Sequence, residues 1–187
     1  GDVYKRQLVM DLITKPTLAQ YTDKQEIKLK EALQFTVKLL EALRAVHDRG
    51  AIHRDLQLSN IYWDGSAVTV ADFGLAEAYE ESENRSAVGT LHYASPEQLR
   101  SINVPVDQRS DLYSVGAVLF HILTGQPPYS SDNPSELLRQ HANAQIPTAS
   151  ELRTDLPAIV DDFLVSLLAK DPDDRPQNAT VALLKME

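Results

Sequence analysis

The sequence contains no cysteine. Disulfide bonds, thiolate metal ligands and a cysteine nucleophile are therefore excluded, and any chemistry must come from carboxylates, amides and hydroxyls. The absence suits a reducing cytosol, and we expect a cytoplasmic location. The chain also lacks an apolar run long enough to cross a bilayer, because the longest, residues 115–123, contains Gly116 and His121. With no signal-peptide pattern at its start, we expect no membrane segment.

Positive charge is scarce. The 187 residues include 18 Lys and Arg against 27 Asp and Glu, which gives a formal net charge of −9. Nucleic-acid binding depends on neutralising phosphates, so this balance argues against a nucleic-acid partner. The hydrophobic content of 43% is enough for one sizeable core, while the length is too short for two ordinary domains. We therefore expect one compact unit.

The spacing of apolar residues predicts a mainly α fold. Asp23 with Glu26 three residues later is a capping-box arrangement, which predicts the start of a long helix that Gly50 ends. The apolar residues of this helix recur at a helical spacing, at Leu29, Leu33, Val37, Leu40 and either Leu43 or Ala45. A loop over residues 52–61 and a short strand over residues 68–70 are expected to follow.

Further helices are expected in the second half of the chain. Residues 111–124 are apolar almost all round, which indicates a helix buried on every side. Residues 133–136 form a capping signature with proline at the first helical position, and Pro157 and Pro176 stand near the starts of two more helical patterns. Residues 72–96 show little periodicity, which predicts a long loop of the kind that is functional or disordered.

Four groups of residues stand in a fixed order along the chain. They are His53-Arg54-Asp55, Asn60, Asp72-Phe73-Gly74 and Ser95-Pro96-Glu97. A single three-residue string recurs by chance about once in 8,000 positions, so any one group alone would be weak support. In this order and spacing, they resemble the catalytic half of a protein kinase domain. The resemblance runs from about Leu8 to about Leu184, and it implies a kinase C-terminal lobe with a short β-hairpin region at the catalytic loop.

The resemblance implies chemical roles for three of these residues. Phosphoryl transfer to a hydroxyl needs a carboxylate near the nucleophile and hard oxygen ligands for magnesium. Asp55 resembles the catalytic aspartate that accepts or orients the proton of the substrate hydroxyl. Asn60 and Asp72 resemble the metal ligands, so the implied cofactors are ATP and Mg²⁺. Taken singly, each of the three is equally a turn-forming polar residue that satisfies the loop backbone.

Gln57 is the sharpest departure from the family pattern. Most Ser/Thr kinases have a lysine two positions after the catalytic aspartate, where its charge lies near the phosphate in transfer. A glutamine amide donates only a neutral hydrogen bond, about half as strong as a charge-assisted one. The departure at this catalytic position predicts a slow or inactive kinase.

The half of the family pattern that grips ATP is missing from this sequence. No glycine-rich phosphate loop and no strand-borne lysine precede Asp55, although the family uses both to position a transferable phosphate. We interpret residues 8–187 as an incomplete kinase domain that runs from the strand before the hinge to the last helices. Residues 1–7 contain a stretch that resembles the translation of a transposon end, so we expect a non-native scar there. An ordinary polar lead-in is the alternative.

The adenine side of the site is expected near the start of the chain. Residues 8–10 resemble the last strand before the kinase hinge, with a plain edge strand as the alternative. Backbone groups of Asp11 and Ile13, in the hinge that follows, would hold the adenine edge. Tyr62 stands where the family places an aliphatic residue under the adenine ring, and its flat face would serve there. Core packing is an equal alternative for this tyrosine.

The resemblance also implies an activation segment. Arg54 resembles the arginine that pairs with a phosphorylated residue, because a guanidinium binds phosphate oxygens at two points. Ser82, Ser86 and Thr90 are the candidate partners. Thr90 fits better as the Ser/Thr-type residue near the catalytic aspartate, which leaves Ser82 or Ser86 as the phosphorylation switch.

Five further residues are expected to be structural, namely His53, Phe73, Glu97, Asp111 and Arg175. His53 and Phe73 resemble residues of a hydrophobic spine, so His53 is not expected to carry protons. Glu97 and Arg175 resemble a distant salt-bridge pair. Asp111 resembles the aspartate that anchors the catalytic loop, and the alternative is a first-turn acid favoured by the helix dipole.

The implied activity is transfer of the ATP γ-phosphate to Ser/Thr hydroxyls of a protein substrate in signal transduction. The Ser/Thr class rests on residues 89–90 and 93–97 and on the absence of the tyrosine-kinase pattern. A pseudokinase or interaction module without catalysis is the alternative, and a small-molecule phosphotransferase is disfavoured by the Ser-Pro-Glu segment. Residues 95–111 are also similar to kinase domains that head large bacterial signalling proteins with downstream modules.

Overall fold

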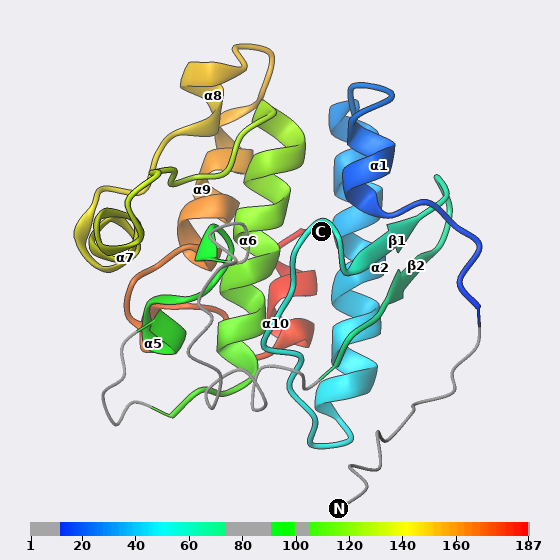
Figure 1. Cartoon of the computed structure of the whole chain (residues 1–187), viewed down its shortest axis with the longest axis horizontal. Coiled ribbons are helices and arrows are strands. Elements are labelled where there is room, and N and C mark those ends of the chain that lie inside the picture. Colours follow the sequence, from blue (N-terminus) through cyan, green and yellow to red (C-terminus); the bar gives the residue numbers. More distant parts are fainter. Residues whose placement is uncertain (1–11, 74–90, 100–104, 187) are drawn as a thin grey trace, which may run out of the picture.

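The computed structural model describes residues 12–73, 91–99 and 105–186. The helices of this part are α1 (Leu18–Thr22), α2 (Leu29–His47), α5 (Pro96–Leu99), α6 (Gln108–Thr124), α7 (Pro134–Asn143), α8 (Ala149–Leu152), α9 (Ala158–Leu167) and α10 (Ala179–Leu184). A 3₁₀ turn, η1, spans Pro172–Asp174. Within the described residues, β-structure is confined to one antiparallel hairpin of β1 (Ile61–Trp63) and β2 (Val68–Val70), so the mainly α prediction is confirmed (Figure 1).

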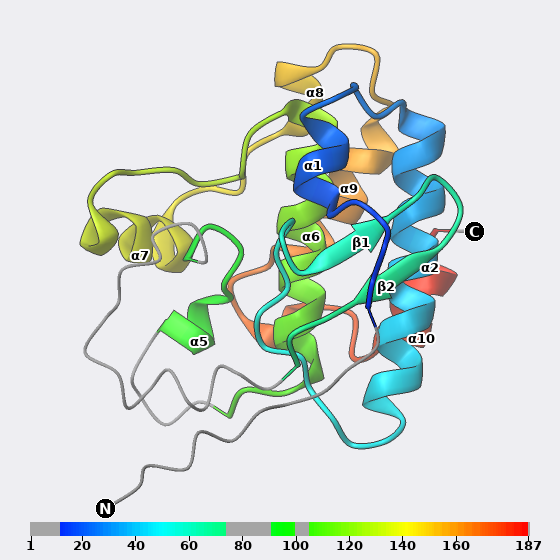
Figure 2. The ribbon, with the colours of Figure 1, turned by 45° about the vertical axis from the view of Figure 1, so that its right-hand side comes forward.

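The two long helices, α2 and α6, lie side by side and run in opposite directions (Figures 1 and 2). Every residue from Ser110 to Phe120 is buried, which confirms the prediction of a helix buried on all sides. Gly116 permits this burial, because a β-carbon there would lie 2.8 Å from Cβ of Leu167 on α9. None of the helices described above is long and apolar enough to span a bilayer.

The core face of α2 differs in part from the predicted stripe. Its fully buried residues are Ala32, Phe35, Thr36, Leu39, Leu40 and Leu43. Leu40 and Leu43 belong to the predicted stripe, whereas Leu29, Leu33 and Val37 are only half-buried beside this face. The apolar arc of the helix is wider than one stripe, and spacing alone does not show which part of it faces the core.

The predicted capping box at Asp23 and Glu26 is wrong. Asp23 instead ends the short helix α1, where its N–H donates to carbonyl oxygens of that helix. The capping box lies at Thr17 and Gln20, where each side chain bonds the backbone N–H of the other residue. Helix α2 begins after Lys28 without a side-chain cap, so burial rather than capping starts this helix.

Other helix ends follow their sequence signals. Gly50 adopts φ 75° and donates its N–H to the carbonyl of His47, while Ala51 donates to Val46, which is the glycine termination expected for α2. Asn133 accepts the N–H of Ser135 at 2.9 Å and caps α7, as predicted.

The β2 strand lies at the residues that the sequence predicted. The loop ahead of the hairpin was predicted over residues 52–61, and it ends one residue earlier because Ile61 starts β1.

The hairpin packs on α2 at the end of the loop that carries the predicted catalytic residues. Its register pairs Ile61 with Val70 and Trp63 with Val68. The ring of Trp63 meets Phe35 of α2 edge-on with centroids 5.5 Å apart. This aromatic contact fixes the strand that follows the loop, and α2 fixes the segment that precedes it.

Candidate active site

The first turn of α6 anchors the loop of residues 51–60. The carboxylate of Asp111 accepts the backbone N–H of His53 at 2.9 Å and that of Arg54 at 2.8 Å. Its Oδ2 also lies 2.8 Å from Nε2 of His47, at the end of α2. Because Asp111 is fully buried, these donors replace the water that the carboxylate loses.

His53 is buried, and both of its ring nitrogens are occupied. Its Nδ1 accepts the N–H of Asp55 at 3.2 Å, while its Nε2 lies 2.8 Å from the carbonyl oxygen of Ala71. Since a carbonyl only accepts, the Nε2 atom carries the proton and the ring is the neutral Nε2–H tautomer. The imidazole therefore joins the loop to the segment after β2 and has no nitrogen available for proton transfer.

Asp55 lies at the centre of a small polar cluster. Nε2 of Gln57 donates to both carboxylate oxygens of Asp55 at 3.2 Å, and Nδ2 of Asn60 donates to Oδ2 at 2.9 Å. Asn60 also holds the main-chain carbonyl of Asp55 at 2.9 Å. Burial raises the pKa of Asp55 above its ordinary value, and the charge of Asp72 adds to this, against the opposing hydrogen bonds of Gln57 and Asn60. The carboxylate is thus oriented by two amides and made more basic by its surroundings.

Asp72 and Phe73 lie beside this cluster, after β2. Asp72 is exposed and takes φ 63°, in the left-handed region that a non-glycine residue seldom adopts. The N–H of Ala71 donates to the carbonyl of Asn60 at 2.9 Å, which keeps the two segments together. The ring of Phe73 meets His53 with centroids 4.5 Å apart, yet 43% of Phe73 remains exposed. Phe73 therefore contacts the loop through His53, and a role of the two rings in a hydrophobic spine stays a prediction.

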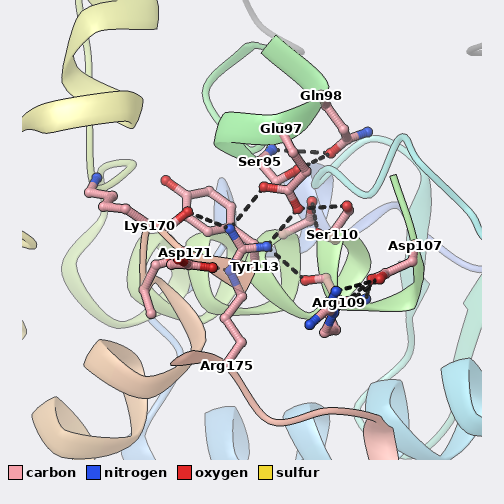
Figure 3. Close-up of polar contacts among 12 residues, drawn as sticks. Ser95, Glu97, Gln98, Asp107, Arg109, Ser110, Tyr113, Lys170, Asp171 and Arg175 are labelled. Atoms are coloured by element: carbon pink, nitrogen blue, oxygen red, sulfur yellow. Dashed lines mark hydrogen bonds and ion pairs between the residues drawn. The ribbon is translucent and has the colours of Figure 1, made fainter. Parts of the chain in front are cut away.

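A residue that sequence analysis did not single out joins α5 to the loop. Nε2 of Gln98 donates to the carbonyl of Arg54 at 2.6 Å, and its Oε1 accepts both the N–H and the hydroxyl of Ser95 (Figure 3). Arg54 takes φ 67°, a strained conformation for a residue other than glycine. Asp111 holds its backbone N–H and Gln98 holds its carbonyl, so both sides of the residue are fixed. The signal for Gln98 was its place directly after the Ser-Pro-Glu group.

Glu97 and Arg175 form a buried two-point ion pair (Figure 3). Nη1 and Nη2 of Arg175 lie 2.6 and 2.9 Å from the carboxylate oxygens of Glu97. The remaining guanidinium protons reach the carbonyls of Ala169, Lys170 and Arg109. Burial alone would raise the pKa of Glu97, but the hydrogen bonds and charge of Arg175 outweigh it and hold that pKa below its usual range.

The remaining predicted site residues either lie outside the described residues or belong to other elements of the fold. Asp11, Ser82, Ser86 and Thr90 lie outside the described residues, as do residues 1–7 and the strand proposed at residues 8–10. Tyr62 is half-buried in β1, opposite Thr69, and makes an isolated bridge with Thr17. Ile13 is half-buried just ahead of α1. An adenine site built from Ile13 and Tyr62 stays a prediction.

Comparison with known proteins supplies the family. The model of the protein kinase domain matches residues 2–185 of this chain. A probable serine/threonine-protein kinase of Clostridium acetobutylicum is 33% identical over 94% of the chain and 27% of its own length. The serine/threonine-protein kinase PknB of Mycolicibacterium smegmatis is 37% identical over 92% of the chain and 28% of its own length.

The chain thus spans little more than a quarter of the length of these curated relatives, 27% and 28%. PknB of Mycobacterium tuberculosis is 38% identical over 80% of the chain. The matched region contains the loop anchored by Asp111, the Asp55 cluster and the Glu97–Arg175 pair described above. With nearly its whole length covered by the family model, the chain belongs to the protein kinase family.

Proposed function

We propose that this chain is the catalytic lobe of a protein serine/threonine kinase. In a complete kinase domain it would transfer the γ-phosphate of ATP to hydroxyl groups of protein substrates. The observation that carries the proposal is the Asp55 cluster, in which two amide side chains hold one partly buried carboxylate in a fixed orientation. The serine/threonine kinases among the relatives support the choice of hydroxyl acceptor.

In this proposal Asp55 accepts the proton of the attacking hydroxyl. The pKa of Asp55 is raised by burial, and the base strength of the carboxylate rises with it. Asn60 fixes the carboxylate and its main chain together, so the base does not swing away from the nucleophile. Gln57 occupies the space beside the same carboxylate and supplies no positive charge, which makes the proposed transfer slow.

The donor set beside Asp55 fits a magnesium site that is completed by substrate. Nδ2 of Asn60 donates to Asp55, while its Oδ1 accepts the hydroxyl of Ser59 at 3.3 Å and keeps a second lone pair that can face a cation. Asp72 adds an exposed carboxylate, and no group of three or more His, Cys, Asp or Glu residues among those described could hold a metal alone. Mg²⁺ takes one or two protein carboxylates together with phosphate oxygens, and it would supply charge neutralisation of those phosphates.

We further propose that residues 8–187 act with an ATP-binding lobe. The only glycines ahead of Asp55 in this sequence are Gly1 and Gly50, so a glycine-rich loop has to be supplied from elsewhere. The proposed reaction consumes ATP and the chain has no cysteine, which supports a cytoplasmic site for it. Partner modules downstream, as in larger bacterial signalling proteins, are part of the same proposal.

The test is a fusion of the ATP-binding lobe of PknB from Mycolicibacterium smegmatis to residue 8 of this chain. We expect slow incorporation of labelled phosphate from γ-labelled ATP into a serine-rich test protein, and its loss on Asp55→Asn. Asp48→Asn is the control, because Asp48 is an exposed acid near the same loop. Phosphate transfer that survives Asp55→Asn, or ATP binding with no transfer even after Gln57→Lys, would overturn the proposal and favour a binding module.

A further inference from the structure

A cavity lies away from the Asp55 cluster. Its volume is about 770 Å³, within the range of small-molecule sites in proteins. It is lined by one face of α2, the turn of the β1–β2 hairpin, the start and middle of α9 and the residues after α10. No residue of the loop 51–60 contributes to it, so it is separate from the proposed catalytic site.

The walls of this cavity are apolar. They include Leu29, Leu33 and Val37, the part of the predicted α2 stripe that the core does not bury. Ile159 and Phe163 of α9 face them, and 71% of Ile159 is exposed. Folded proteins seldom leave a contiguous apolar surface open without a use for it. The unburied stripe therefore points to an occupant with an apolar part.

The charged residues in the lining of this cavity are all basic. Its lining includes Lys30, Lys38 and Lys185 and no Asp or Glu, although the whole chain has 27 acidic and 18 basic residues. Lys38 pairs with Glu41 at 2.9 Å. For Lys30 and Lys185, the described part of the chain provides no ion pair or hydrogen bond to the ammonium group. Two ammonium groups without an ionic partner among the described residues thus belong to the lining of an apolar cavity.

We propose that this cavity binds a single-chain amphiphilic carboxylate, with its alkyl chain against Leu33, Val37 and Phe163 and its carboxylate between Lys30 and Lys185. Each methylene group removed from water favours binding, and the two ammonium groups favour an anionic head. A small polar anion would leave the apolar walls wet, and a neutral oil would leave the two cations without a partner. An alkyl carboxylate satisfies both parts of the lining.

Trp63 makes the proposal directly measurable. It is the only tryptophan in the sequence and it lines the cavity. The Trp63 side chain is only 1% exposed, but bromine quenches tryptophan fluorescence over a short distance without direct contact, so 12-bromododecanoate can be titrated into the 187-residue chain below its critical micelle concentration. We expect saturable quenching, with the Kd of the uncharged methyl ester at least fivefold higher. Quenching that does not saturate, or an ester that binds as tightly as the acid, would overturn the proposal.

The charge requirement is tested by Lys30→Glu combined with Lys185→Glu. We expect the Kd for 12-bromododecanoate to rise at least tenfold. The matched control is Lys24→Glu combined with Arg44→Glu, which changes the net charge equally at exposed positions outside the lining. Its Kd should stay within twofold of the original chain. Equal loss of affinity in both double variants would show that net charge, and not the lysines of the lining, attracts the ligand.

The apolar requirement is tested on one helix. Ile159→Asp places a carboxylate in the path of the alkyl chain and should abolish saturable quenching. Val165→Asp is the control, since Val165 is exposed on the same helix but does not line the cavity. Circular dichroism tests whether both variants fold. If Ile159→Asp does not fold, the lysine double variants test the proposal in its place. Retained binding in folded Ile159→Asp contradicts the proposal. None of these measurements depends on kinase activity.

Discussion

Arg54 holds a left-handed backbone conformation, φ 67°, and donates its N–H to Oδ1 of Asp111 at 2.8 Å. The second oxygen of Asp111 accepts the N–H of His53 and contacts Nε2 of His47. One buried carboxylate thus receives three donors from two segments. A non-glycine residue stays in this conformation only where its surroundings over-determine it, and Asp111 supplies half of that constraint from α6.

Asp111→Asn should therefore destabilise the fold and release the loop. An asparagine keeps one acceptor oxygen, but its NH₂ group would face N–H donors and cannot accept a hydrogen bond from them. We expect the free energy of unfolding in urea to fall by about 3 kcal/mol. Hydrogen exchange of the His53 and Arg54 amides should also become faster. The control Asp162→Asn, at an exposed acid, should change stability by less than about 0.5 kcal/mol. A loss below about 1 kcal/mol for Asp111→Asn would speak against the anchor.

Arg175→Lys tests the geometry of the buried ion pair rather than its charge. Five guanidinium protons have acceptors at Glu97 and three carbonyls, and a lysine supplies only three protons from one point. We expect a loss of about 3 kcal/mol in urea unfolding although the charge is kept. Lys185→Arg is a surface control for the exchange of the two residue types. Unchanged stability in Arg175→Lys would mean that charge alone suffices.

His141 predicts an acid-dependent loss of stability. Burial, and then the charge of Lys170, lowers the pKa of His141 to about 3 from its ordinary 6.5. Between these values the unfolded chain binds a proton that the folded chain does not, so stability falls as pH drops below 6.5. The slope is at most about 1.4 kcal/mol per pH unit. Urea unfolding between pH 7 and pH 4 measures it.

The control for this pH dependence is His141→Asn. Asparagine retains an acceptor for the hydroxyl of Tyr113, which lies 2.8 Å from Nδ1 of His141, but it does not titrate. The difference in unfolding free energy between the two proteins should therefore shrink steadily as the pH falls from 6.5. Parallel curves from pH 7 to pH 4 would assign the acid sensitivity to other groups.

Gln57→Lys should raise the rate of phosphate transfer in the fusion with an ATP-binding lobe. The lysine would bring a full positive charge beside Asp55, where Gln57 now donates at 3.2 Å. We expect kcat to rise roughly ten- to hundredfold, by comparison with the loss of one stabilising donor in other enzymes. Gln34→Lys, at an exposed position of α2, controls for added charge. An unchanged kcat at saturating ATP removes Gln57 as the cause of slow transfer.

Gly116→Ala should destabilise the protein although alanine favours helices. The gain in helix propensity is about 1 kcal/mol. The added β-carbon would lie 2.8 Å from Cβ of Leu167, and neither helix can yield without disturbing the core. Overpacking of this kind costs about 1–3 kcal/mol, so we expect a net loss of about 1 kcal/mol in thermal or urea unfolding. A stabilised variant would show that α9 can move outward.

Sequence patterns predicted the elements whose signals are local. The buried helix α6 reads as apolar on every side, Gly50 marks the end of α2, and Val68–Val70 reads as a strand. The capping box was misplaced because Asp23 and Glu26 fit the same pattern as Thr17 and Gln20, and only the tertiary contacts of α1 separate them. Local spacing carries no information on which of two matching caps is used.

The candidate site was predictable in composition but not in contacts. The ordered motifs named Asp55, Asn60 and Asp72, yet nothing local links Gln98 to the carbonyl of Arg54, 44 residues earlier in the chain. His47 was not singled out either, because its contact with Asp111 spans 64 residues. The His47–Asp111 contact forms only when α2 packs beside α6, and the Gln98–Arg54 contact only when α5 packs on the loop, so both depend on the whole fold.

The Glu97–Arg175 pair also limits how the protein can be made. Glu97 leaves the ribosome 78 residues before its partner, a delay of roughly 4–16 s at ordinary rates of synthesis. Until Arg175 emerges, the Glu97 carboxylate must stay in water, because burying it unpaired is too unfavourable. Helix α5, which carries Glu97, therefore cannot pack into the core until the segment with Arg175 has been translated.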